Sequence, residues 1–416
     1  MKKSILKNVL VKNFLALSTI QIANIILPFI TLPYLARVLG VSNYGVVFMV
    51  YSVMQLLFVL NDYGFNLSAT KEVSNHRLDI RKVNEIFSSI ISIKIVLLLI
   101  TFLLLMLLGI AVPVISEHRE AYFLGFGMVV GQTFTPIWLF QGMERMKYIT
   151  IVNLVSKLTF TILIFVVIDS SEDYIFVPLL YSIGFTIAGF VSIYLAKKEF
   201  GVYFSIPKWF QIKEQLNNST QYFLSRASIA VYTSGNNFIV GIFLGEYYAG
   251  IFGVAEKLYT AMIVVYTPLS DAIYPFMVKK RDMELFKKIF VGVILVNLTV
   301  ITFTYFFSGE IVNIIFGDGY SESAELLKYF CLLAFVIVPT IFIGYPLLGA
   351  FGYEKHANYS VVAGSIIHFL VLLIIYPNLT IYLMALLLIL TQVIVFLVRM
   401  HGVQKLIKLN SLKSNN

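Results

Sequence analysis

Long apolar stretches alternate with short polar segments along the whole chain. A helix needs about 20 mostly apolar residues to cross the hydrocarbon core of a bilayer. We expect twelve stretches to form one spanning helix each, and they cover residues 13–36, 43–65, 86–111, 121–142, 149–168, 175–196, 217–243, 248–275, 289–308, 323–351, 358–376 and 380–399. The pattern therefore predicts an all-α integral membrane protein.

The composition excludes a soluble globular protein. Of the 416 residues, 59% are hydrophobic and 13% are charged, whereas a soluble chain has roughly 25% charged residues. No polar segment is long enough to fold as a second domain. Basic residues precede the first apolar run, but no small-residue cleavage site follows it, so we expect this run to be retained as a span.

Lys and Arg residues are unevenly divided between the segments that join the predicted spans. Of the 31, 24 fall in the two termini and in alternate connecting segments, while two fall in the segments of the opposite side. Cytoplasmic segments of membrane proteins carry the excess of Lys and Arg. We therefore expect both termini in the cytoplasm, and this topology accounts for the net charge of +9 without a nucleic-acid partner.

A short motif occurs twice, once in each half of the chain. Leu39-Gly40-x4-Gly45 is matched by Leu244-Gly245-x4-Gly250, and both copies fall in the outer turn between the first two spans of a six-span half. Parallel repeats of this kind are one known transporter architecture, with the substrate path between the halves. We predict two pseudo-symmetric six-helix lobes, 1–200 and 201–416, joined by the cytoplasmic segment 197–216.

The first span carries two prolines, Pro28 and Pro33, within LPFITLPYLARVLG (27–40). Proline removes a backbone donor and clashes with the preceding helical turn. Such breaks are tolerated in membranes where neighbouring groups or cavity water satisfy the freed carbonyls. We predict that the two prolines form a hinge where this helix faces a cavity.

Three cations lie eight or nine residues in from the predicted cytoplasmic ends of their spans: Lys94, Lys157 and Arg226. At about 1.5 Å per residue they lie about 12 Å deep. Charged residues inside a membrane are costly and by default mark a substrate or ion path. We predict a basic collar around an inward-open cavity, with Lys257 nearer the midplane and Arg37 at the outer interface.

Other polar residues share helix faces with these cations. The side chains predicted to line the same cavity are Gln21, Asn24, Gln55, Asn153, Thr233 and Asn237. The carboxylates predicted to act in ion coupling or gating are Asp62, Glu256 and Asp271, with His368 as a further candidate and H⁺ or Na⁺ as the ion. Arginine and lysine suit phosphate, so a cationic path of this kind favours an anionic amphiphile as substrate.

Several of these charged residues have structural alternatives. Lys94 could reach the interface along its own aliphatic stem, Lys257 could pair with Glu256 or a neighbouring carboxylate, and Arg37 could act as an interfacial anchor. Asp62 and Asp271 could cap the inner ends of their helices, and His368 could be a packed histidine. Arg226 is the hardest to explain in this way, because an arginine cannot lose its charge.

The sequence contains no motif of a catalytic or metal site. Its single cysteine, Cys331, excludes an internal disulfide and a multi-cysteine metal site, and its five histidines are scattered without an HExxH pattern. We expect no enzymatic activity, no metal and no cofactor.

Four stretches resemble polysaccharide flippases of the Wzx type, in the polysaccharide transport family of the MOP/MATE-like exporter superfamily. They are LPYLARVLGVSNYG (32–45), YGFNLSATKEVS (63–74), PIWLFQGMERM (136–146) and YTSGNNFIVGIFLGEYYAGIFGVAEKL (232–258). The resemblance implies a MATE-like fold in which two six-helix lobes enclose a cationic cavity. It also implies movement of undecaprenyl-pyrophosphate-linked oligosaccharide units, of O-antigen or capsule type, between the leaflets of the bacterial inner membrane by alternating access.

Two other functions remain open at this point. One is a multidrug or organic-cation antiporter of the same fold, although a cationic drug would favour a cavity rich in carboxylates. The other is a non-transport scaffold of polysaccharide assembly, although a scaffold would not need charges on the faces of several spans. A lipid-linked glycan, membrane lipids and a polysaccharide polymerase are the expected partners.

Overall fold

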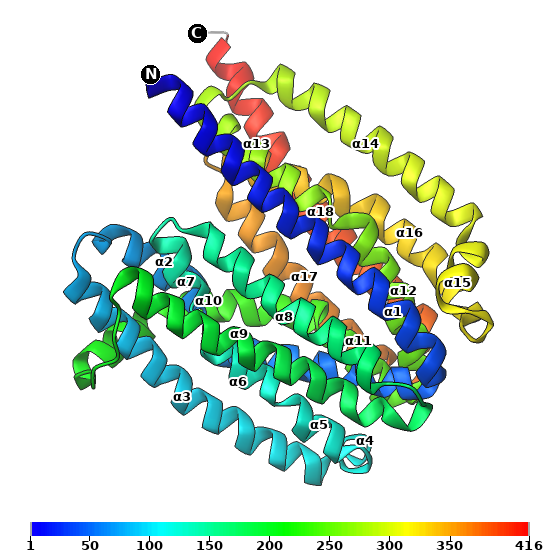
Figure 1. Cartoon of the computed structure of the whole chain (residues 1–416). Coiled ribbons are helices and arrows are strands. Elements are labelled where there is room, and N and C mark those ends of the chain that lie inside the picture. The colour runs from blue at the N-terminus through cyan, green and yellow to red at the C-terminus, as the bar shows by residue number, and fades with distance from the viewer. Residues whose placement is uncertain (1, 415–416) are drawn as a thin grey trace. The chain divides into compact units, whose positions relative to one another are not determined.

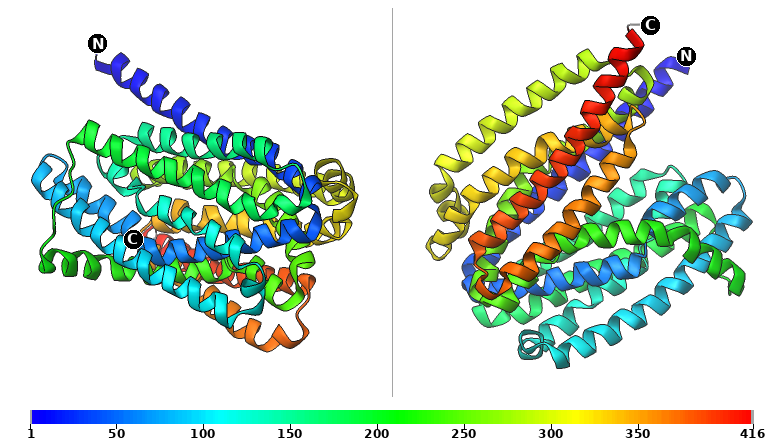
Figure 2. Two further views of the ribbon diagram at one scale, coloured as in Figure 1. Left: turned by 60° about the horizontal axis from the view of Figure 1, so that its bottom comes forward. Right: turned by 180° about the vertical axis from the view of Figure 1, so that it is seen from behind.

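The computed structural model describes the backbone of residues 2–414, and the side chains of residue 27 and residues 30–408 except those at 225, 228, 231 and 232. Every regular element in the described chain is a helix (Figures 1 and 2). Contacts between residues divide the chain into two compact units, Met1–Ala230 and Val231–Asn416. The predicted all-α membrane fold is confirmed.

The first unit contains α1 to α9, η1 and most of α10. The bounds of these elements are α1 Lys2–Asp62, α2 Phe65–His76, α3 Ile80–Ala111, α4 Pro113–Glu117, α5 Arg119–Gly125, α6 Gly127–Thr133, α7 Ile137–Gly142, α8 Met146–Val167, η1 Ser171–Ile175, α9 Phe176–Phe200 and α10 Trp209–Thr233. Its interior is apolar, and Trp138 is fully buried there among side chains of α2, α3 and α9.

The second unit contains α11 to α18. The bounds are α11 Asn236–Leu244, α12 Glu246–Ile263, α13 Tyr266–Lys280, α14 Met283–Phe306, α15 Ser308–Phe316, η2 Asp318–Tyr320, α16 Ser321–Phe342, the π-helix η3 Ile343–Gly349, α17 Glu354–Ile375, η4 Tyr376–Asn378 and α18 Ile381–Ser414. A second apolar cluster joins residues of α13, α14, η3 and α18. In Figures 1 and 2, α17 runs beside α18, as α8 runs beside α9 in the first unit.

Ten helical stretches among the described residues are long and apolar enough to cross a membrane. They correspond to eleven of the predicted spans, because the stretch Ile30–His76 includes the end of the first span and the whole second span. The seventh span, predicted over 217–243, corresponds to α10 and α11, which are separated near Gly235. The helices therefore fit the twelve expected spans.

Several predicted spans are broken. The fourth consists of α5, α6 and α7, and a non-helical Thr135-Pro136 pair precedes α7. The eighth divides into α12 and α13, and the tenth leaves regular α-helix at Gly344 between Pro339 and Pro346. Apolar length predicts where a span lies but does not reveal these interruptions.

The repeated glycines adopt the same backbone conformation. Gly40, at φ 74° and ψ 175°, separates two helices within the bounds of α1, and Gly245, at φ 91° and ψ 174°, separates α11 from α12. Residues with a side chain rarely occupy this region, which is essentially restricted to glycine. The motif found twice in the sequence therefore marks the same turn in both halves.

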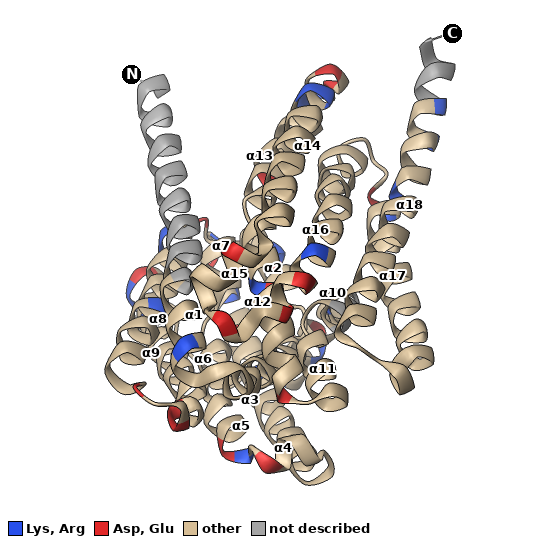
Figure 3. Cartoon of the chain, turned by 90° about the vertical axis from the view of Figure 1, so that its right-hand side faces the viewer, with Lys and Arg blue, Asp and Glu red and all other residues tan. Residues whose placement is uncertain are grey.

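Two contacts in the first unit join connecting segments that the predicted topology places on the same side. In the first unit, Arg77 forms an ion pair with Glu144 at 2.5 Å, joining two segments that were both assigned to the cytoplasmic side. At the other end, the side-chain amide of Asn43 donates to the Ser171 carbonyl at 2.8 Å. In the second unit, Lys279 and Lys280 lie in the last turn of α13, and Arg281 follows them. Figure 3 shows basic residues in blue at the turn between α13 and α14. The side of the membrane that each end faces stays a prediction from the charge pattern.

The division into units falls later in the chain than the predicted boundary between lobes. The repeat pattern places that boundary at residue 200, whereas α10 up to Ala230 packs with the first unit. The boundary at residue 200 comes from the repeat in the sequence and stays a prediction. The boundary at Ala230 comes from which helices pack together.

Candidate functional site

A buried group of polar side chains joins the second, third and fourth spans inside the first unit. Asp62 ends α1 and is 2% exposed, and Lys94 on α3 is 1% exposed. The Lys94 ammonium donates to the backbone carbonyl of Gln132 at 3.2 Å. Asn61 donates to the backbone carbonyl of Lys94 at 2.9 Å and accepts from the Thr133 hydroxyl at 2.9 Å. These bonds fix Lys94 in the interior of the unit.

The Asp62 carboxylate has an unusual environment. Both of its oxygens are buried, and neither makes a hydrogen bond within the part of the chain that the structure describes. The backbone N–H groups of Gly64 and Asn66 lie close to it, but neither forms a regular hydrogen bond with it. The positive charges that act on the carboxylate belong to Lys94 and Arg226. Three residues that the sequence singled out therefore interact electrostatically in one unit.

Arg226 lies near Asp62 because α10 packs closely on the end of the second span. Gly64 allows the approach, since a Cβ added there would lie 2.7 Å from the backbone nitrogen of Phe223. The Ser68 and Ser219 hydroxyl oxygens lie 2.7 Å apart, and the Tyr63 ring stacks on Phe223 with centroids 4.7 Å apart. Arg226 follows on the same face of α10, because residues three and four apart share a helix face.

The other first-unit predictions have different environments. Lys157 on α8 is half-buried, and it makes no hydrogen bond or ion pair with any residue whose side chain is described. Asn153 and Gln55 are also half-buried, and Arg37 is exposed. A role for Lys94 on a cavity surface would need another conformation that exposes it. The predicted basic collar stays a prediction.

Some predicted residues lie outside the side chains that the structure describes. These are Gln21, Asn24 and Pro28. Pro33 is described, and α1 stays helical through it, because the non-helical position within the bounds of α1 is Gly40. The hinge at the two prolines therefore stays a prediction.

Predicted residues of the second unit do not form a comparable group. Asn237 is buried, and its side-chain amide donates to the Ala249 carbonyl at 2.9 Å, which joins α11 to α12. Glu256 and Lys257 are adjacent and half-buried on α12, whereas Thr233 and Asp271 are exposed. His368 is buried, with its Nδ1 2.9 Å from the Thr391 hydroxyl. The contact of Asn237 joins two helices, and the roles predicted for all of these residues stay predictions.

Sequence reasoning missed Arg399 on α18. Its guanidinium donates to the Thr340 carbonyl at 2.6 Å and to the Ser360 hydroxyl at 3.0 Å, at the point where α16 gives way to the irregular η3. A Cβ at Gly344 would lie 2.5 Å from this guanidinium. The sequence feature that could have indicated a role for Arg399 is the pair Pro339 and Pro346 within an apolar span. Prolines leave backbone carbonyls without their helical donors, so these carbonyls need other donors.

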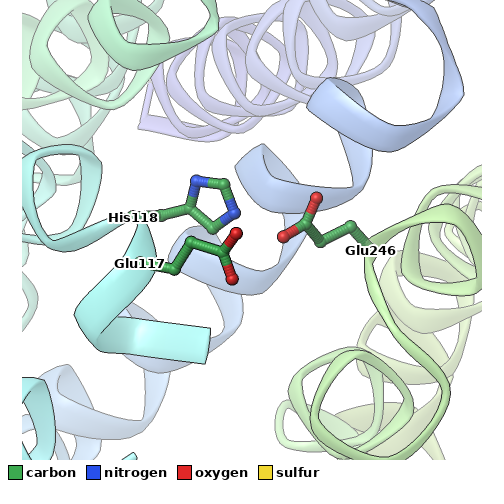
Figure 4. Close-up of side chains that lie close together, drawn as sticks. All are labelled: Glu117, His118 and Glu246. Atoms are coloured by element: carbon green, nitrogen blue, oxygen red, sulfur yellow. The ribbon is translucent and has the colours of Figure 1, made fainter. Parts of the chain in front are cut away.

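Figure 4 shows Glu117 and His118, which are consecutive residues at the end of α4, together with Glu246, the first residue of α12. His118 lies 3.1 Å from the Tyr174 hydroxyl within its own unit. Glu246 belongs to the second unit.

Comparison with solved structures supports a MATE-like fold. A multidrug resistance MATE family transporter of the MOP superfamily, in an inward-facing conformation, aligns with a TM-score of 0.70 at 14% identity, covering 92% of this chain and 96% of that one. The lipid II flippase MurJ, in an inward closed conformation, aligns with a TM-score of 0.72 at 14% identity, covering 94% and 87%. At this identity the likeness concerns the fold.

Sequence comparison identifies the family. Two proteins named "Putative O-antigen transporter" are similar to this chain. The one from Escherichia coli (strain K12) is 26% identical over 84% of this chain and 85% of its own length, and the one from Shigella dysenteriae is 28% identical over 81% and 85%. Residues 10–281 match the family described as polysaccharide biosynthesis protein. This match covers more than half of the sequence, and the chain therefore belongs to the polysaccharide biosynthesis protein family.

Proposed function

We propose that this protein moves undecaprenyl-pyrophosphate-linked oligosaccharide units from the inner to the outer leaflet of a bacterial cytoplasmic membrane by alternating access. Support comes from the family match, from the names of its relatives and from a fold shared with a lipid II flippase. In this proposal the protein acts as a carrier without catalysis, with both termini in the cytoplasm.

The observation that carries the proposal is the position of Arg226. This half-buried arginine lies on a helix of a membrane domain, and no carboxylate among the described residues forms an ion pair with it. A guanidinium keeps its charge at any physiological pH, so its position inside a membrane protein is costly. The Asp62 carboxylate acts on this charge but does not form an ion pair with it. Its planar fork of donors matches the oxygens of a phosphate group. We assign Arg226 to the pyrophosphate of the substrate.

Lys157 is the second residue in this assignment. Its ammonium is half-buried within a spanning helix and has no polar partner among the described side chains. An ammonium attracts phosphate as a compact charge, without the geometric match of a guanidinium. We therefore expect Lys157 to add attraction for the pyrophosphate, and Arg226 to fix its orientation.

The test is complementation of a strain that lacks the gene, scored by surface polysaccharide at matched protein levels. Arg226→Ala should nearly abolish export, and Arg226→Glu should be worse because it repels the pyrophosphate. Arg226→Lys should retain part of the export, because the charge remains while the paired donors are lost. One hydrogen bond to a charged group contributes roughly 1.5–3 kcal/mol, which is about one to two decades in affinity.

Arg119→Ala is the matched control. Arg119 is an exposed arginine at the start of α5, in a segment assigned to the opposite side of the membrane. Its removal should leave export unchanged. Full export by Arg226→Ala, or equal loss in both variants, would contradict the assignment. In a separate experiment, flippases with known substrates are expressed in the deletion strain. Those that restore surface polysaccharide identify the glycan.

A further inference from the structure

One face of α10 aligns Arg226 with the end of the second span. Gln215, Ser219, Phe223 and Arg226 follow one another at spacings of three or four residues, so they lie on one side of the helix. The Gln215 side-chain amide donates to the carboxylate of Glu72 on α2 at 3.0 Å, and Ser219 and Phe223 make the α2-side contacts described above. All these contacts lie within the first unit. They hold the Arg226 turn of α10 beside the end of α1.

Asp62 is the nearby group that lacks a partner. It ends α1, two residues before the glycine against which α10 packs. Its carboxylate is almost fully buried, and both oxygens lack hydrogen bonds from the described residues. Burying a charged group without compensation is costly. The charges of Lys94 and Arg226 both act on the carboxylate and offset part of the cost of its burial.

We propose that Asp62 is a positioning residue that attracts the Arg226 guanidinium while no substrate is bound, and that a phosphate group binds Arg226 in competition with this carboxylate. The inference rests on the proposed function, because it concerns the same arginine. The inference adds that the Asp62 carboxylate competes with the substrate for Arg226. This competition sets how tightly Arg226 holds an anion.

The arrangement of charges explains why such an exchange is feasible. A carboxylate and a phosphate are both anions that accept hydrogen bonds from a guanidinium. If phosphate draws Arg226 away, Asp62 keeps the attraction of Lys94, which its own hydrogen bond to Gln132 holds in the interior. The carboxylate is then not left as an isolated buried charge, which would cost far more. One anion replaces another at Arg226, and this limits substrate affinity so that release remains feasible.

The experiment measures binding of farnesyl pyrophosphate to the purified full-length protein in detergent. Asp62→Asn removes the competing charge and keeps the size of the side chain, so it should bind farnesyl pyrophosphate about tenfold more tightly, the factor expected from one modest charge interaction. In an Arg226→Ala background, the same substitution should give no gain. A purely structural role for Asp62 predicts weaker binding or none, because loosening the fold does not raise affinity.

Glu72→Gln is the matched control. It removes a carboxylate that contacts the same helix, α10, but contacts it at Gln215 and not at Arg226. It should change affinity much less than Asp62→Asn. If Asp62→Asn does not fold, the double variant Asp62→Asn/Lys94→Met, which removes both buried charges, should also bind more tightly than the natural protein.

The outcomes separate this inference from the proposed function. If Arg226→Ala loses binding but Asp62→Asn, or the double variant in its place, gains none, only the inference fails. Gains that persist without Arg226, or equal gains in Glu72→Gln, would also overturn it. If Arg226→Ala binds farnesyl pyrophosphate as tightly as the natural protein, the substrate assignment and the inference fail together.

Discussion

Replacing each repeated glycine with alanine should destabilise the unit in which it lies. Gly40 and Gly245 have nearly identical dihedral angles, in a region that is rare for residues with a side chain. A Cβ added at either position meets no other atom within 4 Å, so steric clash adds nothing. The cost is the backbone strain alone, which is of order 1–3 kcal/mol for each substitution.

Gly292→Ala is the matched control. Gly292 lies in the middle of α14, and an added Cβ there also meets nothing within 4 Å. Its backbone is helical, and alanine is favoured over glycine in helices by about 0.5–1 kcal/mol. The same chemical change should therefore be neutral or stabilising at this position.

The protein provides one natural probe for each unit. Both tryptophans lie in the first unit, where Trp138 is fully buried and Trp209 is exposed, and the single cysteine, Cys331, is buried in the second unit. Tryptophan fluorescence should detect the loss of stability in Gly40→Ala, and reaction of the cysteine with a thiol-reactive dye on heating should detect it in Gly245→Ala. If both variants melt at the same temperature as Gly292→Ala, the argument from backbone conformation is wrong, and the structural equivalence of the two turns loses its support.

Three further predictions concern topology, the hinge and the tenth span. In a variant without the natural cysteine, a cysteine at Ser171 should react with an impermeant thiol reagent from the periplasm and one at Ser205 should not; the opposite pattern would reverse the orientation. Replacing Pro28 and Pro33 together with alanine should slow export while the protein still inserts, and normal surface polysaccharide would count against the hinge. Arg399→Leu should lower the melting temperature, because hydrogen bonds from a charged donor contribute about 1.5–3 kcal/mol each; unchanged melting would show that water replaces these bonds.

The spans were predictable because the thickness of the bilayer fixes how many consecutive apolar residues a spanning helix needs. A helix that crosses a bilayer must cover its hydrocarbon thickness, and the ten stretches found among the described residues fall where the hydropathy pattern predicts. The turns at Gly40 and Gly245 were also signalled, because a conformation that requires glycine leaves that glycine in both copies of a repeat.

The breaks within spans were harder to predict. Pro33 lies within a continuous helix, whereas the eighth span divides at Val264 and Val265, just before Pro268 in the first turn of α13. A proline in an apolar stretch therefore does not by itself tell whether the span breaks. A helix can also end because neighbouring helices satisfy its terminal groups, and neighbours are not encoded locally.

The candidate site was predicted in part. Helical periodicity and depth singled out Asp62, Lys94 and Arg226 as separate residues, but only the packing of α10 on α2 shows that their charges interact. Arg399 was assigned to the end of the last span, and its contact with Thr340 depends on an irregular helix distant in sequence. Contacts between side chains far apart along the chain carry no periodic signal.

The most direct measurement of the central claim is transport by the purified protein in liposomes. A lipid-pyrophosphate-linked oligosaccharide is incorporated, and the fraction of glycan accessible to a soluble glycosidase outside the vesicle is followed over time. We predict that the natural protein exposes glycan from the inner leaflet, that Arg226→Ala does so much more slowly, and that Arg119→Ala matches the natural protein. Equal rates for Arg226→Ala and the natural protein, or no transfer above that of protein-free vesicles, would contradict the account.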